Sequence, residues 1–507
     1  MSAISKSVPV SRAQSPAIKQ KNSQAKTPAI QHAKNAKTQR AKTVVAPKKT
    51  LAEVLAGLGE GKRKKLNASV TLVKELDDSS VKHFYTKVGA CAKMRKILGT
   101  AYTAYVREQL GYEHAHAHRL AVVGDLIGRW SPRGDGWKVL TGESHFRPLL
   151  GLEAAEQDVV LATLARWKAM TASAKVSPRM VLAAVTVVKP PTGPREADNA
   201  ANELVARACQ VIADQRKLLG ASVGKEVLKA FDVVKKKVAK LNGPRRSSGI
   251  DWTTATWNPL HGCTRASAGC DHCYAAELTA TRLASKYPGL AKAVTVNGET
   301  RYVFTGKILL APEHLGVPLQ DLVPKRFFVN SMSDLFHKNV PDEFIEAVFD
   351  VMEKANWHTF QVLTKRPERM ATFTTKRYKD KEPPPHIWLG ASTENQEAYD
   401  ERWPELVKVK TAVRWLSMEP LLGPVKLKDA DKLDWAVVGG ESGSERAMKE
   451  VWATSLRDQC KKAGVPFFFK QHSDYGEEGE KRAKSKKDGL TPPTLDGVVH
   501  DAYPAQA

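Results

Sequence analysis

Hydrophobic positions follow different patterns in the two halves of the 507-residue chain. From residue 49 to 188, Leu, Val and Ala recur at intervals of three and four with few Gly or Pro, which predicts a mostly helical domain. From about residue 250 to 474, short β-rich apolar runs alternate with helical stretches, which is typical of βα units around a parallel sheet. The pattern therefore predicts an α/β fold preceded by an all-α domain.

Three other segments lack these patterns. Residues 1–48 hold few large apolar side chains and are expected to form a disordered arm. Residues 189–249 are expected to be a linker in which prolines interrupt regular structure at the start. It is expected to contain an amphipathic helix with one apolar face packed against the protein and one basic face exposed to solvent. Residues 475–507 are expected to be a C-terminal tail. The chain has neither a membrane-length apolar run nor a secretory leader, so we expect a cytoplasmic protein without a membrane partner.

Seven apolar runs are predicted strands of the second half: 255–258, 326–330, 359–363, 387–390, 413–416, 435–438 and 466–469. Polar residues follow every one of them. Because the carboxyl ends of parallel strands share one rim, we expect these side chains to surround the mouth of a partial barrel. The candidates at this rim are Asn330, Ser331, Ser333, Asp334, Lys365, Arg366, Ser392, Glu394, Asn395, Glu419, Gly439, Gly440, Glu441 and Lys470.

The composition excludes a wholly disordered or fibrous chain, since 42% of residues are hydrophobic and 26% are charged. The 79 Lys and Arg exceed the 54 Asp and Glu by 25. The first 50 residues contain eleven of these cations and no acid, and a second basic run ends at Arg246, so the surplus is concentrated outside the predicted barrel. This favours contact of the arm with nucleic-acid phosphates, although a solubilising tail or an organelle transit peptide stays open.

The helical half contains one more specific pattern. Residues 105–110, Gly111 and residues 114–120 have the layout of a helix-turn-helix, whose second helix would present His114, His118 and Arg119 to a DNA groove. A metal held by the two histidines, spaced i, i+4, is the less favoured alternative. Together with residues 140–150 and 177–181, this region resembles the helical modules of plasmid-partition and phage DNA-binding proteins, which implies DNA as a partner.

Three of the six cysteines lie within eleven residues, directly after the first predicted strand. Cys263, Cys270 and Cys273 form a Cys-x6-Cys-x2-Cys cluster. Three thiolates on one loop can hold three irons of a [4Fe–4S] cluster and leave the fourth iron open to a small molecule. A zinc site, with His261, His272 or Cys460 as fourth ligand, and three unliganded thiols are the alternatives.

The cysteine-containing run 250–275 and the segments 328–337, 363–370, 388–396, 417–424, 438–443 and 468–471 occur in order between about residues 250 and 472. Together they resemble a phage-associated three-cysteine family related to radical SAM proteins. Two details depart from the usual radical SAM pattern, because the first gap is longer than three residues and His272 occupies the aromatic position. The resemblance implies a radical SAM-type (βα) partial barrel, a [4Fe–4S] cluster, S-adenosylmethionine and an electron donor such as flavodoxin or ferredoxin.

The same resemblance implies roles for the rim. Asp334, with Asn330, Ser331 and Ser333, would contact the methionyl amine, and Ser392, Glu394 and Asn395 the ribose. The turn of Gly439, Gly440 and Glu441 would approach adenine or a carboxylate. Lys365 and Arg366 are expected to hold a substrate phosphate. Glu419 is expected either to pair with Arg414 or to face substrate, together with Lys470.

These features favour a radical SAM enzyme that modifies or repairs nucleic acid or a nucleotide. Two alternatives remain: a non-catalytic DNA-binding protein with a structural iron–sulfur or zinc site, and a radical SAM enzyme that modifies a partner protein. Six tryptophans of the second half could stack on a base, but we expect most of them in the core. They are Trp252, Trp257, Trp388, Trp403, Trp415 and Trp435.

Overall fold

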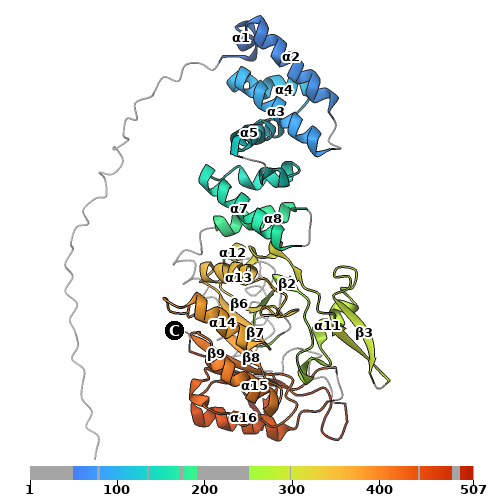
Figure 1. Ribbon diagram of the computed structural model, residues 1–507, viewed down its shortest axis with the longest axis vertical. Helices are drawn as coiled ribbons and strands as arrows, with labels where there is room; N and C mark the ends of the chain where they lie inside the picture. Colours follow the sequence, from blue (N-terminus) through green and yellow to red (C-terminus); the bar gives the residue numbers. More distant parts are fainter. Residues whose placement is uncertain are drawn as a thin grey trace, which may run out of the picture.

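The computed structural model describes residues 49–76, 80–133, 136–171, 175–190, 250–296, 298–443, 446–481 and 492–505. The basic arm expected at 1–48 and most of the expected linker, 191–249, lie outside the described residues. Figure 1 shows a helical domain stacked on an α/β domain along the long axis of the molecule.

The helical domain confirms the prediction for residues 49–188. Its helices are α1 (Leu51–Ala56), α2 (Glu60–Glu75), α3 (Val81–Leu98), α4 (Tyr102–Leu110), α5 (His114–Trp130), α6 (Glu143–Phe146), α7 (Ala154–Met170) and α8 (Pro178–Val188). Local chemistry sets several ends. Thr50 and Glu53 form a capping box on α1, and Gly111 ends α4 at φ +70°. Gly124 lets α5 approach α3, because a Cβ there would lie 2.1 Å from the Val88 carbonyl oxygen.

The α/β domain contains one seven-stranded sheet in which every neighbouring pair is parallel. Its order is β1 (Ala255–Trp257), β6 (Arg326–Val329), β7 (Thr359–Thr364), β8 (Ile387–Ser392), β9 (Val413–Met418), β10 (Trp435–Gly439) and β11 (Phe467–Gln471). All seven predicted strands are confirmed. The sheet curls into a half-barrel with β1 and β11 at its edges.

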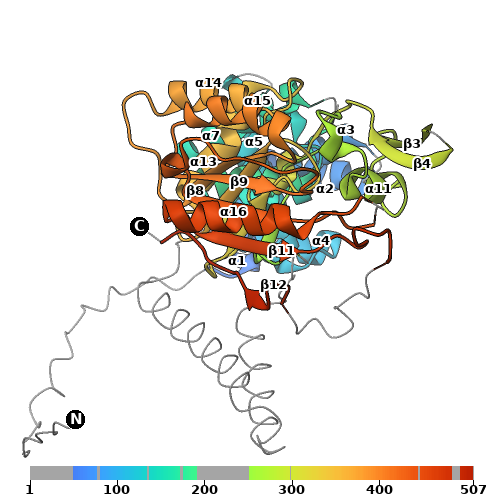
Figure 2. The same ribbon diagram turned by 90° about the horizontal axis from the view of Figure 1, so that it is seen from below.

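Helices cover the outer face of the half-barrel. They are α13 (Asp342–Lys354), α14 (Pro367–Arg377), α15 (Gln396–Val407) and α16 (Glu450–Ala463), and Figure 2 shows α14, α15 and α16 alongside the strands. Successive strand residues alternate between two hydrophobic clusters, as the pleat requires. For example, Phe327 packs in the large cluster beneath the helices, whereas Phe328 packs in a second, smaller cluster. Both faces of the sheet are therefore buried.

Tryptophans fill the inner face. Trp252, Trp388, Trp415 and Trp435 form the second cluster with Phe328, Val413, Val437 and Phe468, and each of the four is at most 3% exposed. Their rings meet mainly edge to face, as between Trp252 and Trp415. Trp257 and Trp403 are buried in the outer cluster. The expectation that most of the six tryptophans are core is confirmed.

Three two-stranded sheets surround the half-barrel. They are β2 (Leu260–His261) with β5 (Leu309–Leu310), β3 (Ala291–Val296) with β4 (Glu299–Phe304), and β12 (Thr494–Leu495) with β13 (Val498–Val499). The β3–β4 hairpin projects from the domain beside α11 (Tyr274–Ala280) in both ribbon views. Residues 492–505, which the sequence assigned to a tail, return to the sheet: the Trp435 indole donates to the Ala502 carbonyl at 2.8 Å, and Tyr503 stacks on its ring.

The two domains meet where α8 packs on α12 (Val317–Gln320) and α13. Lys354 Nζ donates to the Val187 carbonyl at 2.7 Å, and Gln320 Nε2 donates to Thr186 Oγ1 at 3.2 Å. Among the described residues, no helix has the length and apolar character needed to cross a membrane.

Candidate functional site

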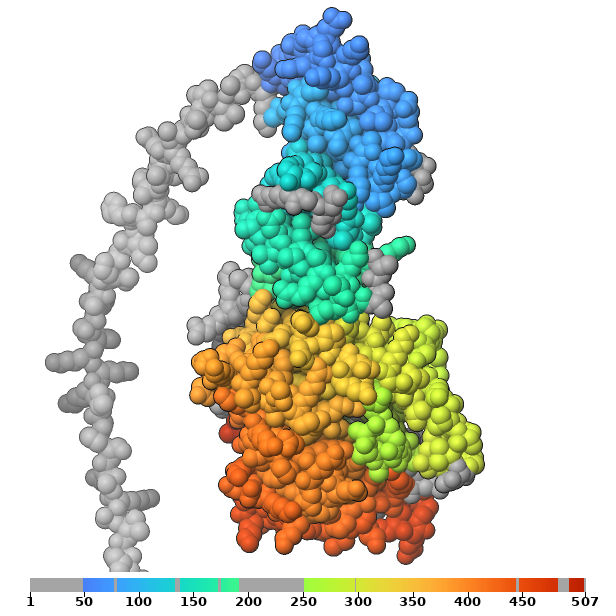
Figure 3. All heavy atoms as spheres, in the orientation of Figure 1, coloured from blue at the N-terminus to red at the C-terminus, as the bar shows by residue number. Residues whose placement is uncertain are grey.

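The three cysteines lie on the loop that leaves β2 at the carboxyl end of the sheet. Gly262 pairs with Ser333, which follows β6, and so places the loop at the rim. The backbone of Gly262 has φ +95°, and a Cβ there would lie 2.1 Å from the Lys307 carbonyl oxygen, so only glycine fits this entry to the loop. In the space-filling view, the bright green segment around α11 reaches the surface between the β3–β4 hairpin and the barrel (Figure 3).

Cys263, Cys270 and Cys273 are free thiols of intermediate exposure. Burial raises the pKa of Cys263 to about 12, and the Asp334 carboxylate adds to this increase while the Arg366 guanidinium opposes it. Burial also raises the pKa of Cys273, and the charge of Cys270 contributes in the same direction. Cys270 contributes to the increase at Cys263 as well. The thiols therefore lie close enough to influence one another electrostatically.

An ion pair between Asp334 and Arg366 anchors the start of this loop. Arg366 Nη1 donates to Asp334 Oδ2 at 2.6 Å, and Nη2 donates to the Thr264 carbonyl and hydroxyl oxygens at 3.2 and 3.0 Å. Asp334 is 5% exposed and also accepts hydrogen bonds from Thr364 Oγ1 and the Lys365 N–H. Both side chains predicted for cofactor or substrate thus contact protein groups in this structure.

Glu394, at the end of β8, anchors the middle of the loop. Its carboxylate is 1% exposed, accepts the Gly269 N–H at 3.1 Å and pairs with Arg402 at 3.0 Å. Lys365 Nζ lies 3.6 Å away. Burial alone would raise the pKa of Glu394, but these cations and the amide outweigh it and lower the pKa to about 2. Glu394 is therefore a buried carboxylate anion.

A third anchor comes from the end of β10. Glu441 forms a two-point ion pair with Arg446. Arg446 in turn donates to the Ala268 carbonyl at 2.9 Å and lies 3.8 Å from Asp271. Three strand ends far apart in the sequence thus fix one cysteine loop across the rim.

The remaining cofactor candidates also have protein partners. Ser331 Oγ and the Asn258 side chain exchange hydrogen bonds, and Asn330 Nδ2 donates to Ser333 Oγ at 2.7 Å. The Ser392 carbonyl accepts from Arg402, and Asn395 caps α15 through the Ala398 N–H. The structure places all of them at the rim, as predicted.

Glu419 and Lys470 meet at the inner edge of the rim. Lys470 Nζ lies 2.9 Å from the Glu419 carboxylate, which also accepts from the Trp252 indole and the Ser417 hydroxyl at 3.2 and 3.1 Å. Arg414, the alternative partner considered for Glu419, instead donates to backbone carbonyls before β9. The partner of Glu419 is Lys470.

Packing requires a glycine at position 440, directly after β10, and leaves little room for a side chain at Gly439, the last residue of β10. A Cβ on Gly440 would lie 2.2 Å from the Ser473 nitrogen, and one on Gly439 would lie 3.1 Å from Glu419 Oε1. The close neighbours of this turn are therefore protein atoms.

The donor chemistry of the loop fits an iron–sulfur cluster, because it offers three free thiols on one segment at the rim. Among the described residues, no three His, Cys, Asp or Glu side chains converge as they would around a single ion. Cys460 is buried in the outer core beneath α16 and is no fourth ligand.

A family model for proteins of unknown function, DUF5131, matches residues 247–504, just over half of the sequence. The chain belongs to this family. Searches of curated proteins and of solved structures found no match. The DUF5131 match includes residues 492–504, in agreement with their packing on the half-barrel.

Outside the DUF5131 domain, α5 presents two of the three predicted nucleic-acid residues. His114 and His118 are exposed on its first turns. Arg119 is only half-exposed, because its Nε donates to Glu143 Oε1 at 2.7 Å. His116 and Arg147 also lie beside this carboxylate. The structure thus places Arg119 in a contact within the helical domain, a partner that helical spacing alone does not reveal.

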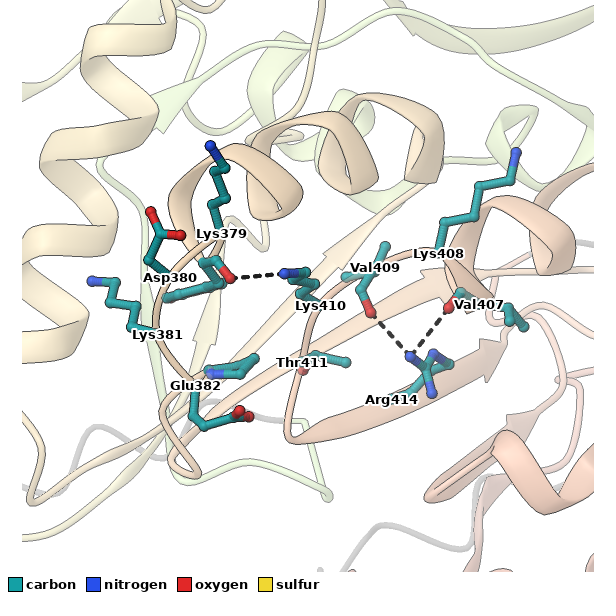
Figure 4. Close-up of a pocket in the computed structure, with 12 residues that line it drawn as sticks. Lys379, Asp380, Lys381, Glu382, Val407, Lys408, Val409, Lys410, Thr411 and Arg414 are labelled. Carbon is teal, nitrogen blue, oxygen red and sulfur yellow. Dashed lines mark hydrogen bonds between the residues drawn. The ribbon is translucent and has the colours of Figure 1, made fainter.

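A cavity of about 610 Å³ lies at the other end of the DUF5131 sheet, beside the segments 378–383 and 407–411 that precede β8 and β9 (Figure 4). Two of its basic side chains contact nearby backbone. Lys410 Nζ donates to the Tyr378 carbonyl at 2.9 Å, and Arg414 donates to the Val407 and Val409 carbonyls. This cavity is separate from the cysteine loop.

Sequence reasoning missed Arg402, Arg446 and His337. His337 is fully buried, and its Nε2 lies 2.8 Å from Thr264 Oγ1. Its Nδ1 accepts the Asn339 N–H, so Nε2 carries the proton. His337 lies in the segment that follows β6, and this position after a strand end could have identified it as a rim residue. Arg402 lies inside a helix and Arg446 on a loop, where nothing in the spacing distinguishes them.

Proposed function

We propose that the DUF5131 domain is a radical SAM-type iron–sulfur enzyme that modifies or repairs nucleic acid or a nucleotide. The observation that carries this proposal is the three-thiol loop fixed across the carboxyl rim of a parallel half-barrel, the place where such folds bind ligands. A surface loop without a function at the rim would not need to be held by buried charged side chains from three strand ends.

Cys263, Cys270 and Cys273 would hold three irons. Such a cluster, with S-adenosylmethionine, supplies a 5′-deoxyadenosyl radical that abstracts hydrogen. The chain's own contribution is rigidity and exclusion of water. Glu394, Arg446 and Arg366 hold the loop, while the tryptophan cluster closes the inner face below the rim. The Glu419–Lys470 pair lies above those indoles, where it can hydrogen-bond a substrate.

The charge distribution supports recruitment to nucleic acid by the first half of the chain. Residues 250–507 carry 35 Lys and Arg and 35 Asp and Glu, so the whole surplus of 25 cations belongs to residues 1–249. The positive charge of residues 1–249 would therefore attract a polyanion such as nucleic acid.

Anaerobic reconstitution with iron and sulfide, then reduction with S-adenosylmethionine present, tests the enzymatic proposal. We expect the visible absorbance of an iron–sulfur cluster and the release of 5′-deoxyadenosine, and we expect Cys270→Ala to lose both signals. Cys460→Ala is the matched control, since Cys460 lies in the outer core. Absence of both signals from wild type would refute the proposal. A stable cluster without S-adenosylmethionine cleavage would favour the alternative of a structural site in a DNA-binding protein.

Duplex binding measured against salt concentration tests recruitment. Deletion of residues 1–48 should reduce the slope of log K against log salt, by about 0.9 for each phosphate that the arm neutralises. The double variant His114→Ala/His118→Ala should weaken binding with a smaller change of slope. An unchanged slope after the deletion would rule out binding of phosphates by the arm.

A further inference from the structure

Arg366 is fixed beside one of the three thiols. Its Nη1 lies 4.0 Å from Cys263 Sγ while donating to Asp334 Oδ2 at 2.6 Å. Its Nη2 donates twice to Thr264. Both terminal nitrogens are therefore occupied, and the side chain is only 16% exposed. This arrangement suits a role toward the sulfur better than the predicted capture of a substrate phosphate.

A second layer of contacts holds the pair in place. Asp334 accepts from Thr364 Oγ1 at 2.7 Å, from the Phe336 N–H at 2.9 Å and from the Lys365 N–H at 3.2 Å. On the other side, Thr264 Oγ1 accepts from His337 Nε2. Charges held this rigidly cannot turn away when the charge on a neighbouring group changes, so their effect on that group is retained.

We propose that Asp334 and Arg366 are positioning residues that set, with opposite signs, the reduction potential of the cluster bound through Cys263. This inference rests on the proposed function. Reduction adds negative charge to the cluster and its thiolates. The guanidinium stabilises that charge and raises the potential, whereas the carboxylate disfavours it and lowers the potential.

Reductive titration of the reconstituted full-length protein, followed by absorbance and electron paramagnetic resonance, tests the inference. Arg366→Gln should make the midpoint potential more negative by at least about 59 mV, which for one electron corresponds to a tenfold change in the reduction equilibrium constant. Asp334→Asn keeps the side-chain shape and should make it more positive. The midpoint potential of the double variant should return toward the wild-type value. Arg366→Lys keeps the positive charge, so its midpoint potential should stay close to that of wild type. Lys376→Gln is the charge-matched control, since Lys376 is exposed on α14, the helix that Arg366 precedes.

A structural role alone would not produce shifts of opposite sign. Shifts in the same direction, or shifts no larger than that of Lys376→Gln, would overturn the inference. If Arg366→Gln does not fold, which thermal unfolding would show, Asp334→Asn still decides the sign of the carboxylate's effect, and a negative shift of the midpoint potential in that variant would overturn the inference. A wild-type protein that takes up no iron would instead sink the proposed function, so the two failures are distinguishable.

Discussion

Replacing Glu394 by Gln removes a buried charge that lies between two cations and the cysteine loop. The folded-state pKa of Glu394 is about 2 against an ordinary 4.5. At 1.36 kcal/mol per pKa unit, ionisation of Glu394 stabilises the folded state by about 3 kcal/mol at neutral pH. The variant also removes the buried ion pair of Arg402, which is 2% exposed and whose other contacts are the Ser392 carbonyl at 2.8 Å and the Glu401 carboxylate at 4.0 Å. Removal of one member of a buried pair costs a similar amount. We therefore expect Glu394→Gln to lower the free energy of unfolding by about 3 kcal/mol.

Hydrogen exchange over a urea series, read on peptides from residues 250–505, measures this change separately from the helical domain. Glu397→Gln is the control, since Glu397 is exposed in the first turn of α15 and should change stability by less than about 0.5 kcal/mol. Because the folded-state pKa is depressed, the stabilisation is present above pH 4.5 and is lost as the pH falls toward 2. Equal stability of the two variants at neutral pH would refute the reasoning.

Two further predictions concern the half-barrel. Burial lowers the pKa of His358 to about 4 from 6.5. Proton uptake by this residue in the unfolded chain should therefore contribute about 2 kcal/mol to the stability that wild type loses between about pH 7 and pH 5, and His358→Gln should reduce the loss by that amount. Urea unfolding at both pH values measures it, and equal losses would contradict the prediction. Gly440→Ala should destabilise by about 1–3 kcal/mol, because its Cβ would meet Ser473, whereas Gly423→Ala has its nearest neighbour at 3.5 Å. Thermal unfolding that ranks the two alanine variants equally would contradict the packing argument.

The sheet was predictable because its evidence is local. Each strand is an apolar run closed by polar residues, and parallel topology then brings all the carboxyl ends to one rim. The two-sided burial of the sheet explains why the runs are nearly continuous rather than alternating. The sequence does not show that tryptophans fill the inner face, since either face of a strand could have carried them.

The roles at the rim were not predictable, because they depend on contacts between distant segments. Arg446 reaches the Ala268 carbonyl 178 residues away, and Arg366 reaches Thr264 across 102 residues. A strand-end position indicates that a charged side chain lies at the mouth, but not whether it faces a ligand or another loop. The same holds for Arg119, whose helical position predicts exposure while Glu143 provides a partner.

The pairing of charges at the rim limits what the half-barrel can recognise. Lys365 lies beside Glu394, Arg366 pairs with Asp334, Arg446 with Glu441, and Lys470 with Glu419. A phosphate backbone drawn to this rim would have to displace carboxylates that are already in place, at the cost of leaving them buried and unpaired. The 25 surplus cations in residues 1–249 need no such displacement. Under the proposed function, we therefore expect phosphate-backbone contacts from the first half of the chain, and we expect the rim to hydrogen-bond a single reacting nucleotide or side chain.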